Sequence, residues 1–200
     1  MSTLPKTRFT PQEYLEMEEK TEYKSEYYQG EIFAMAGATY EHNVVAGNAL
    51  RQIGNQLGSR PCSVCPSDLR IHTPLTGLYT YPDVVVICGE PKFLDKARTT
   101  FLNPTVVVEV LSPSTEAYDR GRKFEHYQSL ESLREYLLIA SDRVSATLFR
   151  RQSELAWLSI TVTTLDSVVE LESAGCRLTL RDLYEKVEFP VEESAPVSAS

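Results

Sequence analysis

The sequence lacks any long hydrophobic run. Its most apolar stretches, residues 81–88, 105–111 and 135–140, fall far short of the roughly 20 residues that a membrane helix requires. The first residues, Met1-Ser-Thr-Leu-Pro, also lack the basic region followed by an apolar region that marks a secretory signal. We therefore expect no membrane span and a cytoplasmic location.

Cysteine is scarce, with four residues in a chain of 200. Disulfide frameworks belong mainly to small secreted domains, so we expect free thiols in a reducing compartment. Cys62 and Cys65 have the CxxC spacing of zinc or redox motifs, but no second CxxC or His pair completes a four-ligand site. A thiol redox protein stays an alternative, although such a protein needs a helix start at the CxxC and the surroundings here are strand-like.

Basic residues are also fewer than acidic ones. The chain has 20 Lys and Arg against 28 Asp and Glu, a formal net charge of −8. Such a balance counts against sequence-independent binding of nucleic acid, which relies on basic surfaces. A metal-dependent site must itself be acidic, however, and divalent ions with a local basic patch can offset the average.

The remaining composition is that of an ordinary globular protein, with 42% hydrophobic and 24% charged residues and no internal repeat. The length favours a single domain over residues 1–190. Residues 191–200 are small and polar and include proline, which predicts a disordered C-terminal tail.

The first part of the chain predicts a helix, a hairpin and a second helix. Thr10, Pro11 and Glu13 form a capping box at the start of a helix that ends near residue 20. Gln29-Gly30 supplies a turn between two short aromatic and branched segments, which indicates a β-hairpin. From residue 42 to 57, apolar side chains recur every four positions, which predicts a helix that Gly58 ends.

The second part alternates strands with a helix. We expect strands at residues 63–72, 83–88, 105–111, 135–140 and 146–150, a helix at 115–130, a hairpin through 157–162 and 168–171, and a short helix at 178–184 capped by Thr179. The near-continuous Val and Ile runs at 83–88 and 105–111 are typical of strands covered on both faces. The sequence therefore predicts an α/β fold with a central mixed β-sheet flanked by helices, preceded by an N-terminal helix and hairpin.

Two carboxylates accompany these buried strands. Asp83 follows Pro82 at the start of one strand, and Glu109 lies inside Val-Val-Val-Glu-Val-Leu. A carboxylate in apolar surroundings must be protonated or have a cationic partner. A structural salt bridge is one explanation, and coordination of a hard divalent cation by both acids is the other.

The whole set of motifs resembles the Uma-two family of restriction endonuclease-like proteins. The resemblance covers residues 9–184 and is carried by Gln29-Gly-Glu-Ile, Glu41-His-Asn, Ser67-Asp-Leu-Arg, Tyr81-Pro-Asp-Val-Val-Val, Val108-Glu-Val-Leu-Ser-Pro-Ser-Thr, and Asp119 with Lys123 and Tyr127. It implies the PD-(D/E)xK nuclease fold, in which Asp83 and Glu109 would bind Mg²⁺ or Mn²⁺ and a lysine would assist attack of water on a phosphodiester.

The sequence departs from that superfamily pattern at one position. The lysine expected two residues after the second acid is Leu111 here. The following helix offers Lys123, which shares a face with Asp119 and Tyr127 at spacings of four. Lys123 is thus the candidate catalytic lysine, and an ordinary helical pair with Asp119 is the alternative.

Further candidates surround this core set. His42 could be a third metal ligand or a helix cap, and the backbone carbonyl of Leu111 could be a fourth ligand. The other candidates for substrate-binding or supporting roles are Tyr127, Arg120, Arg122, Glu26, Glu31 and Asp68.

We therefore predict a Mg²⁺- or Mn²⁺-dependent endonuclease that acts on nucleic acid, with DNA favoured over RNA. Paired cuts in duplex DNA would favour a homodimer. The main alternative is an inactive nuclease-fold homodimer that acts as an interaction or regulatory protein, which the acidic charge and the missing strand lysine support.

Overall fold

A six-stranded mixed sheet forms the centre of the protein, whose computed structural model describes residues 8–189. Its strand order is β11-β10-β9-β8-β6-β3. The strands are β3 (Cys62–Pro66), β6 (Val84–Cys88), β8 (Val106–Leu111), β9 (Glu135–Ala140), β10 (Ala146–Arg151) and β11 (Trp157–Val162). Strands β8 and β9 pair in parallel and the other neighbours pair antiparallel, which confirms the predicted mixed sheet.

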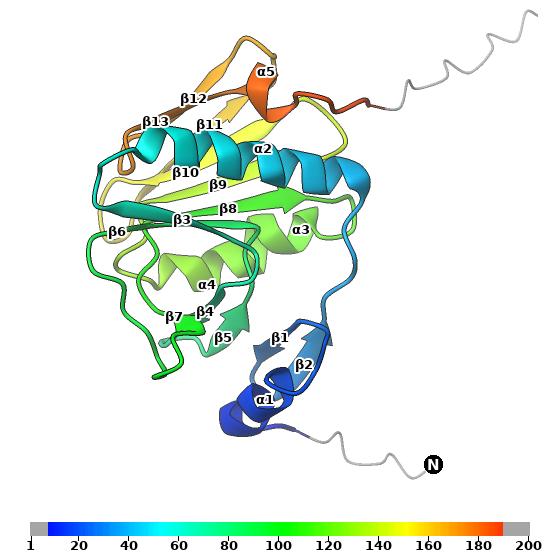
Figure 1. Cartoon of the computed structure of the whole chain (residues 1–200), viewed down its shortest axis with the longest axis vertical. Helices are drawn as coiled ribbons and strands as arrows, with labels where there is room; N and C mark the ends of the chain where they lie inside the picture. The colour runs from blue at the N-terminus through cyan, green and yellow to red at the C-terminus, as the bar shows by residue number, and fades with distance from the viewer. Residues whose placement is uncertain (1–7, 190–200) are drawn as a thin grey trace, which may run out of the picture.

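Helices cover both faces of this sheet (Figure 1). Helix α2 (Tyr40–Leu57) buries the predicted stripe of Val45, Ala49, Ile53 and Leu57 against one face. The opposite face carries one continuous helical segment made of α3 (Glu116–Tyr118), η1 (Asp119–Lys123) and α4 (Phe124–Gln128). This segment is the crossover between the parallel strands β8 and β9, and its Lys123 and Tyr127 contact Glu109 of β8.

A second sheet with strand order β2-β1-β5-β4-β7 lies below the first in Figure 1. Its strands are β1 (Ser25–Tyr28), β2 (Glu31–Ala34), β4 (Arg70–Thr73), β5 (Leu78–Thr80) and β7 (Thr100–Phe101). The predicted hairpin is confirmed as β1 and β2, with Gln29 and Gly30 at φ of 48° and 89° in the turn. Helix α1 (Pro11–Glu18) begins with the predicted capping box and packs Tyr14 against the aromatic rings of this sheet.

The C-terminal elements differ from the sequence prediction. Strand β11 pairs with β10, whereas β12 (Val168–Leu171) pairs with β13 (Cys176–Thr179), so the predicted hairpin between residues 157–162 and 168–171 is wrong. Helix α5 (Leu180–Leu183) starts at Thr179, whose hydroxyl accepts a hydrogen bond from the Asp182 backbone as predicted. The predicted tail from residue 191 lies outside the described residues.

Two further predictions are corrected. The single strand expected over residues 63–72 is two strands in different sheets, β3 and β4, because the turn around Ser67 and Asp68 separates them. Cys62 and Cys88 stand opposite each other on β3 and β6 and form a disulfide, so the expectation of four free thiols is wrong. Cys65 and Cys176 are free, which leaves no Cys62–Cys65 redox pair. Within residues 8–189, no helix has the length and apolar character that crossing a membrane requires.

Candidate functional site

Asp83 and Glu109 belong to neighbouring segments of the central sheet. Val84 of β6 pairs with Val108 of β8; Asp83 directly precedes Val84, and Glu109 directly follows Val108. The Glu109 side chain lies on the face covered by η1 and α4, since its alternate neighbours Val107 and Leu111 pack there.

Asp83 links this strand pair to helix α2. One carboxylate oxygen accepts a hydrogen bond from the Val110 backbone N–H at 2.7 Å, and the same oxygen lies 3.4 Å from His42 Nε2. His42 occupies the first turn of α2, where Thr39 caps the helix. Burial opposes a charge on His42, but the Asp83 carboxylate and neighbouring groups outweigh it and raise the pKa of His42.

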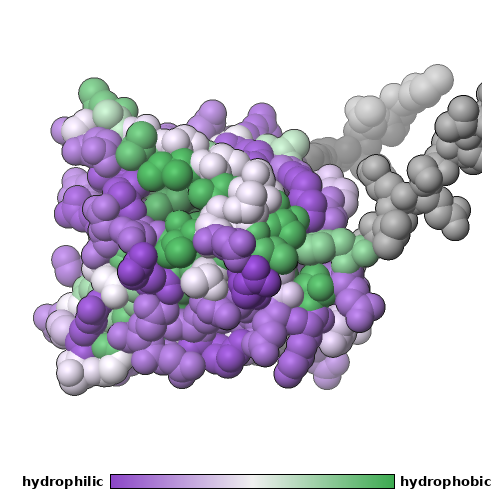
Figure 2. All heavy atoms as spheres, turned by 90° about the horizontal axis from the view of Figure 1, so that it is seen from above, coloured by the Kyte–Doolittle hydropathy of each residue, from purple (hydrophilic) through white to green (hydrophobic). Residues whose placement is uncertain are grey.

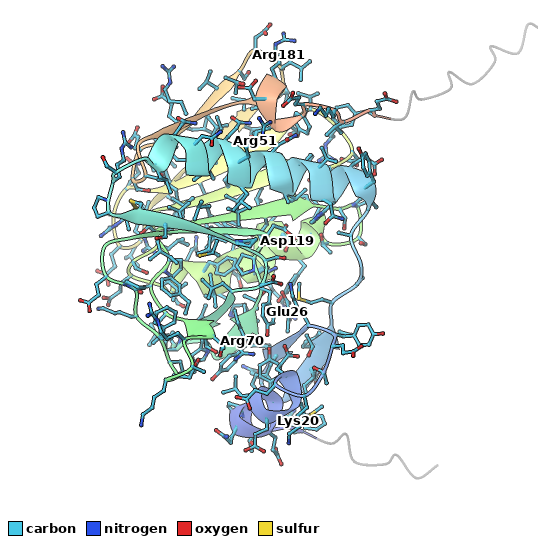
Figure 3. The ribbon with its side chains drawn as sticks, in the orientation of Figure 1. Lys20, Glu26, Arg51, Arg70, Asp119 and Arg181 are labelled. Atoms are coloured by element: carbon cyan, nitrogen blue, oxygen red, sulfur yellow. A yellow bond between two sulfur atoms is a disulfide. The ribbon has the colours of Figure 1, made fainter. Side chains whose placement is uncertain are left out.

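Lys123 lies among three carboxylates from three different elements. Its Nζ atom is 3.0 Å from Glu109 Oε1, 3.1 Å from Glu26 Oε1 and 3.5 Å from Asp119 Oδ1. Figure 3 shows Glu26 and Asp119 on either side of the junction between the hairpin and the main body. Lys123 is only 5% exposed, so solvent screens these contacts little. We call Lys123, Glu26, Glu109 and Asp119 the lysine cluster.

A π-helical turn contributes two members of the lysine cluster. The segment Asp119–Lys123 is π-helical, and it buries both Asp119 and Lys123. Such turns are rare and occur frequently at functional sites, because the extra residue per turn redirects side chains.

Tyrosine and threonine hydroxyls hold the cluster carboxylates in place. Tyr127, which is fully buried, donates a hydrogen bond of 2.8 Å to Glu109 Oε1. Tyr118 donates to Glu26 Oε2 at 3.2 Å, and Thr80 of β5 donates to Glu26 Oε1. The carboxylates are therefore oriented by the protein rather than by solvent.

Negative charge exceeds positive charge in this region. Burial raises the pKa of Glu109 to about 8, an effect that Lys123 opposes and that Asp119 and Asp83 increase. Burial also raises the pKa of Asp119, whereas the pKa of Lys123 is raised because the three carboxylates outweigh its own burial. The four carboxylates thus face one ammonium and one imidazole, and the excess requires a proton or a further cation.

Some side chains of the site are of the types that bind hard divalent cations, although they do not surround a common point as the ligands of a metal ion do. Asp83, Glu109 and His42 offer two carboxylates and an imidazole, and the buried Nδ1 of His42 has no hydrogen-bond partner among the described residues. However, no group of three or more His, Cys, Asp or Glu side chains within residues 8–189 stands in metal-binding positions. The Leu111 carbonyl accepts hydrogen bonds from the backbone and hydroxyl of Ser141, which use both of its lone pairs, so it is not free to bind a metal ion.

The other predicted residues separate into those near the cluster and those away from it. Arg120 pairs with Glu116 at 2.7 Å, and Asp68 is highly exposed and pairs with Lys24, so neither lies in the cluster. Arg122 and Glu31 line a neighbouring cavity.

Sequence reasoning missed Tyr118 and Thr80 as supports of Glu26. Thr80 lies in β5, between the strands expected at 63–72 and 83–88, and Tyr118 precedes the π-helical turn, which no pattern in the sequence indicates. Glu26 itself was named as a candidate, but only the structure places it on Lys123.

This architecture, with paired acids on adjacent strands and a lysine delivered from the crossover helix, defines a restriction endonuclease-like class of protein. A crystal structure described as "a putative nuclease belonging to DUF820 from Anabaena variabilis" aligns with a TM-score of 0.73 over 88% of this chain and 98% of that one. The sequences are 20% identical, so this likeness concerns the fold.

The chain belongs to the Uma2 family, whose description is "Putative restriction endonuclease" and whose sequence model matches residues 11–181. Two proteins of Synechocystis sp. are also similar. "Uncharacterized protein slr1290" is 38% identical over 92% of this chain and 96% of its own length. "Uncharacterized protein sll1609" is 38% identical over 74% of this chain and 84% of its own length. The resemblance expected from the motifs is confirmed.

Proposed function

We propose that this protein is a divalent-cation-dependent endonuclease that hydrolyses phosphodiester bonds in cytoplasmic nucleic acid, with DNA as the favoured substrate. The observation that carries this proposal is the buried Glu109, which lies 3.0 Å from Lys123 on a strand next to the one that Asp83 precedes. Family membership supports the nuclease class.

Asp83, Glu109 and His42 are the residues that would hold Mg²⁺ or Mn²⁺. When bound, such an ion supplies a water of lowered pKa and polarises the phosphate. A divalent ion would also balance the excess of carboxylates around Lys123 and remove the need for a proton on Glu109.

Lys123 is the residue proposed to act on the attacking water. An ammonium group can orient a water molecule and stabilise negative charge that develops on the phosphate. Glu26 and Asp119 would fix the position of its Nζ atom, because each lies within 3.5 Å. Lys123 thereby takes the place of the lysine missing at Leu111.

A homodimer is the proposed assembly. Strand β11 is an edge of the six-stranded sheet and pairs only with β10 within the described residues. Its Leu158 and Ile160 are 44% and 39% exposed, and Figure 2 shows hydrophobic side chains gathered on the face seen from above. An unpaired apolar edge strand is a ready surface for a second copy.

The proposal is tested with supercoiled plasmid and single-stranded DNA in the presence of Mn²⁺. We expect cleavage by the wild type and a loss of at least about 100-fold in Asp83→Ala and Lys123→Ala, in line with the effect of removing one charge-stabilising group. Arg120→Ala is the matched control, since Arg120 lies on the same helix but pairs with Glu116. The proposal fails if the wild type does not cleave, or if all four proteins cleave equally.

The alternative function is an inactive nuclease-fold homodimer that binds a partner. The net charge of −8 and the three carboxylates on Lys123 favour it, because a fully paired lysine is also a stable structural element. Such a scaffold would bind no divalent cation at Asp83 and Glu109. Calorimetric titration with Mn²⁺ separates the two functions.

A further inference from the structure

A cavity of about 320 Å³ lies beside the lysine cluster, between the β1–β2 hairpin and the segment of η1 and α4. Its lining includes Arg8, Tyr28, Phe33, Arg122, Glu125 and His126. Ligand pockets for small molecules begin at about 300 Å³, so the space suits one nucleotide rather than a stacked base pair.

The cavity is built on the same elements as the lysine cluster. Phe33 of β2 is the register partner of Glu26 on β1, so the two side chains project from the same face of the hairpin. Tyr28 is two residues beyond Glu26 and shares that face. On the helical side, His126 lies three residues after Lys123, a spacing at which helical side chains are neighbours. A ligand in the cavity would therefore lie near the lysine cluster.

Aromatic surface is available in the cavity. Phe33 is 48% exposed, which is unusual for a phenylalanine and leaves a ring face open to a ligand. Tyr28 packs on His126 with ring centroids 4.6 Å apart, which fixes the imidazole. Bases stack on such rings whatever their sequence, because every base has a π-face.

Polar groups complement this aromatic surface. His126 is 8% exposed, and it lines the cavity on the helical side. Glu125 offers carboxylate oxygens to an exocyclic amine, and the guanidinium groups of Arg8 and Arg122 suit phosphate oxygens.

We propose that this cavity binds an unpaired nucleotide adjoining the bond to be cleaved, with its base on Phe33 and the flanking phosphates on Arg122 and Arg8. The preferred substrate is then single-stranded DNA or duplex DNA with an unpaired base, since a base within a duplex cannot enter without leaving its stack. The inference rests on the proposed nuclease function, and it adds the substrate class.

The test is a binding measurement that needs no catalysis. Fluorescence anisotropy would compare a labelled single-stranded oligonucleotide with the same sequence as a blunt duplex, in the presence of a chelator so that no cleavage occurs. We expect tighter binding of the single strand by the wild type. Phe33→Ala should weaken single-strand binding by about 5–100-fold, the effect of losing one base–aromatic stack.

Two further variants keep the test specific. Phe33→Trp should bind at least as tightly as the wild type, since it keeps an aromatic face. Tyr23→Ala, which removes an 81% exposed aromatic residue outside the cavity, should stay within about twofold. Circular dichroism would check that each variant is folded.

The proposal is overturned if the duplex binds as tightly as the single strand, if Phe33→Ala binds like the wild type, or if no nucleic acid binds. These binding results do not test the nuclease proposal. That proposal is tested separately, by measuring Mn²⁺-dependent cleavage. Cleavage that depends on Asp83 and Lys123, with single-strand binding insensitive to Phe33, would refute the nucleotide cavity alone.

Discussion

Replacing Lys123 with methionine tests whether the lysine cluster is held together by one buried cation. Methionine has nearly the volume of the lysine stem, so the change removes the charge with little loss of packing. Three carboxylates within 3.5 Å would lose their partner. Breaking a buried ion pair by removing one partner costs about 3–5 kcal/mol of folding free energy, and we expect a loss of that size at pH 8.

The loss should depend on pH in a defined direction. The pKa of Glu109 is already raised to about 8 in the folded protein, and without Lys123 the folded-state pKa values of Glu109 and Asp119 rise further. The folded variant therefore binds more protons than the unfolded chain between about pH 4 and 8, and its stability falls as pH rises through this window. At pH 5, where Glu109 is protonated in the folded variant and needs no cation, the loss should be smaller than at pH 8.

Urea unfolding at pH 5 and pH 8 measures both quantities, with the unfolding free energy of the variant subtracted from that of the wild type at each pH. Lys96→Met is the matched control, because Lys96 is exposed and should change stability by less than about 0.5 kcal/mol at either pH. A loss for Lys123→Met that is equal at both pH values, or below about 1 kcal/mol at pH 8, would refute the electrostatic account of the cluster.

Three other expectations concern neighbouring groups. Asp83→Asn should weaken Mn²⁺ binding at least about 10-fold in calorimetric titration, because a neutral amide replaces one carboxylate ligand, and unchanged affinity would place the ion elsewhere. Tyr127→Phe should lower the free energy of unfolding by about 1 kcal/mol or more, since it removes the 2.8 Å hydrogen bond to the buried Glu109; a stability equal to the wild type in urea would contradict that bond. The Cys62–Cys88 disulfide closes a sequence separation of 26 residues, which corresponds to about 3.5 kcal/mol of loop-closure entropy. Thermal unfolding with and without reductant should show a lower Tm for the reduced protein, and a Tm insensitive to reductant would mean that the disulfide does not form.

Much of the fold could be predicted from the sequence because several helices and turns are specified by residues close together in the chain. The capping box of Thr10 and Glu13, the Gln29-Gly30 turn and the four-residue stripe of α2 each act over a few residues, and each appears in the structure. The pairing of β11, β12 and β13 depends on long-range contacts, and no local pattern indicates which strand takes which partner. The disulfide was missed for a similar reason, since residues 62 and 88 meet only through the register of β3 and β6.

The candidate site divides in the same way. Glu109 is conspicuous in sequence because a lone acid in an apolar strand requires a partner, and the spacing of Asp119, Lys123 and Tyr127 correctly indicated one helix face. The π-helical turn and the contact from Glu26 on the hairpin are tertiary features, so sequence could name these residues without joining them.

We propose that Asp83 and Glu109 jointly bind a divalent cation. Crystals of the wild-type protein soaked in Mn²⁺ would show this, because manganese gives an anomalous signal that identifies its position. We predict a peak about 2.0–2.6 Å from carboxylate oxygens of both residues, the range of hard-cation ligand distances. A map with no peak between these two side chains, and with Lys123 Nζ still in contact with Glu109, would rule out a shared metal site.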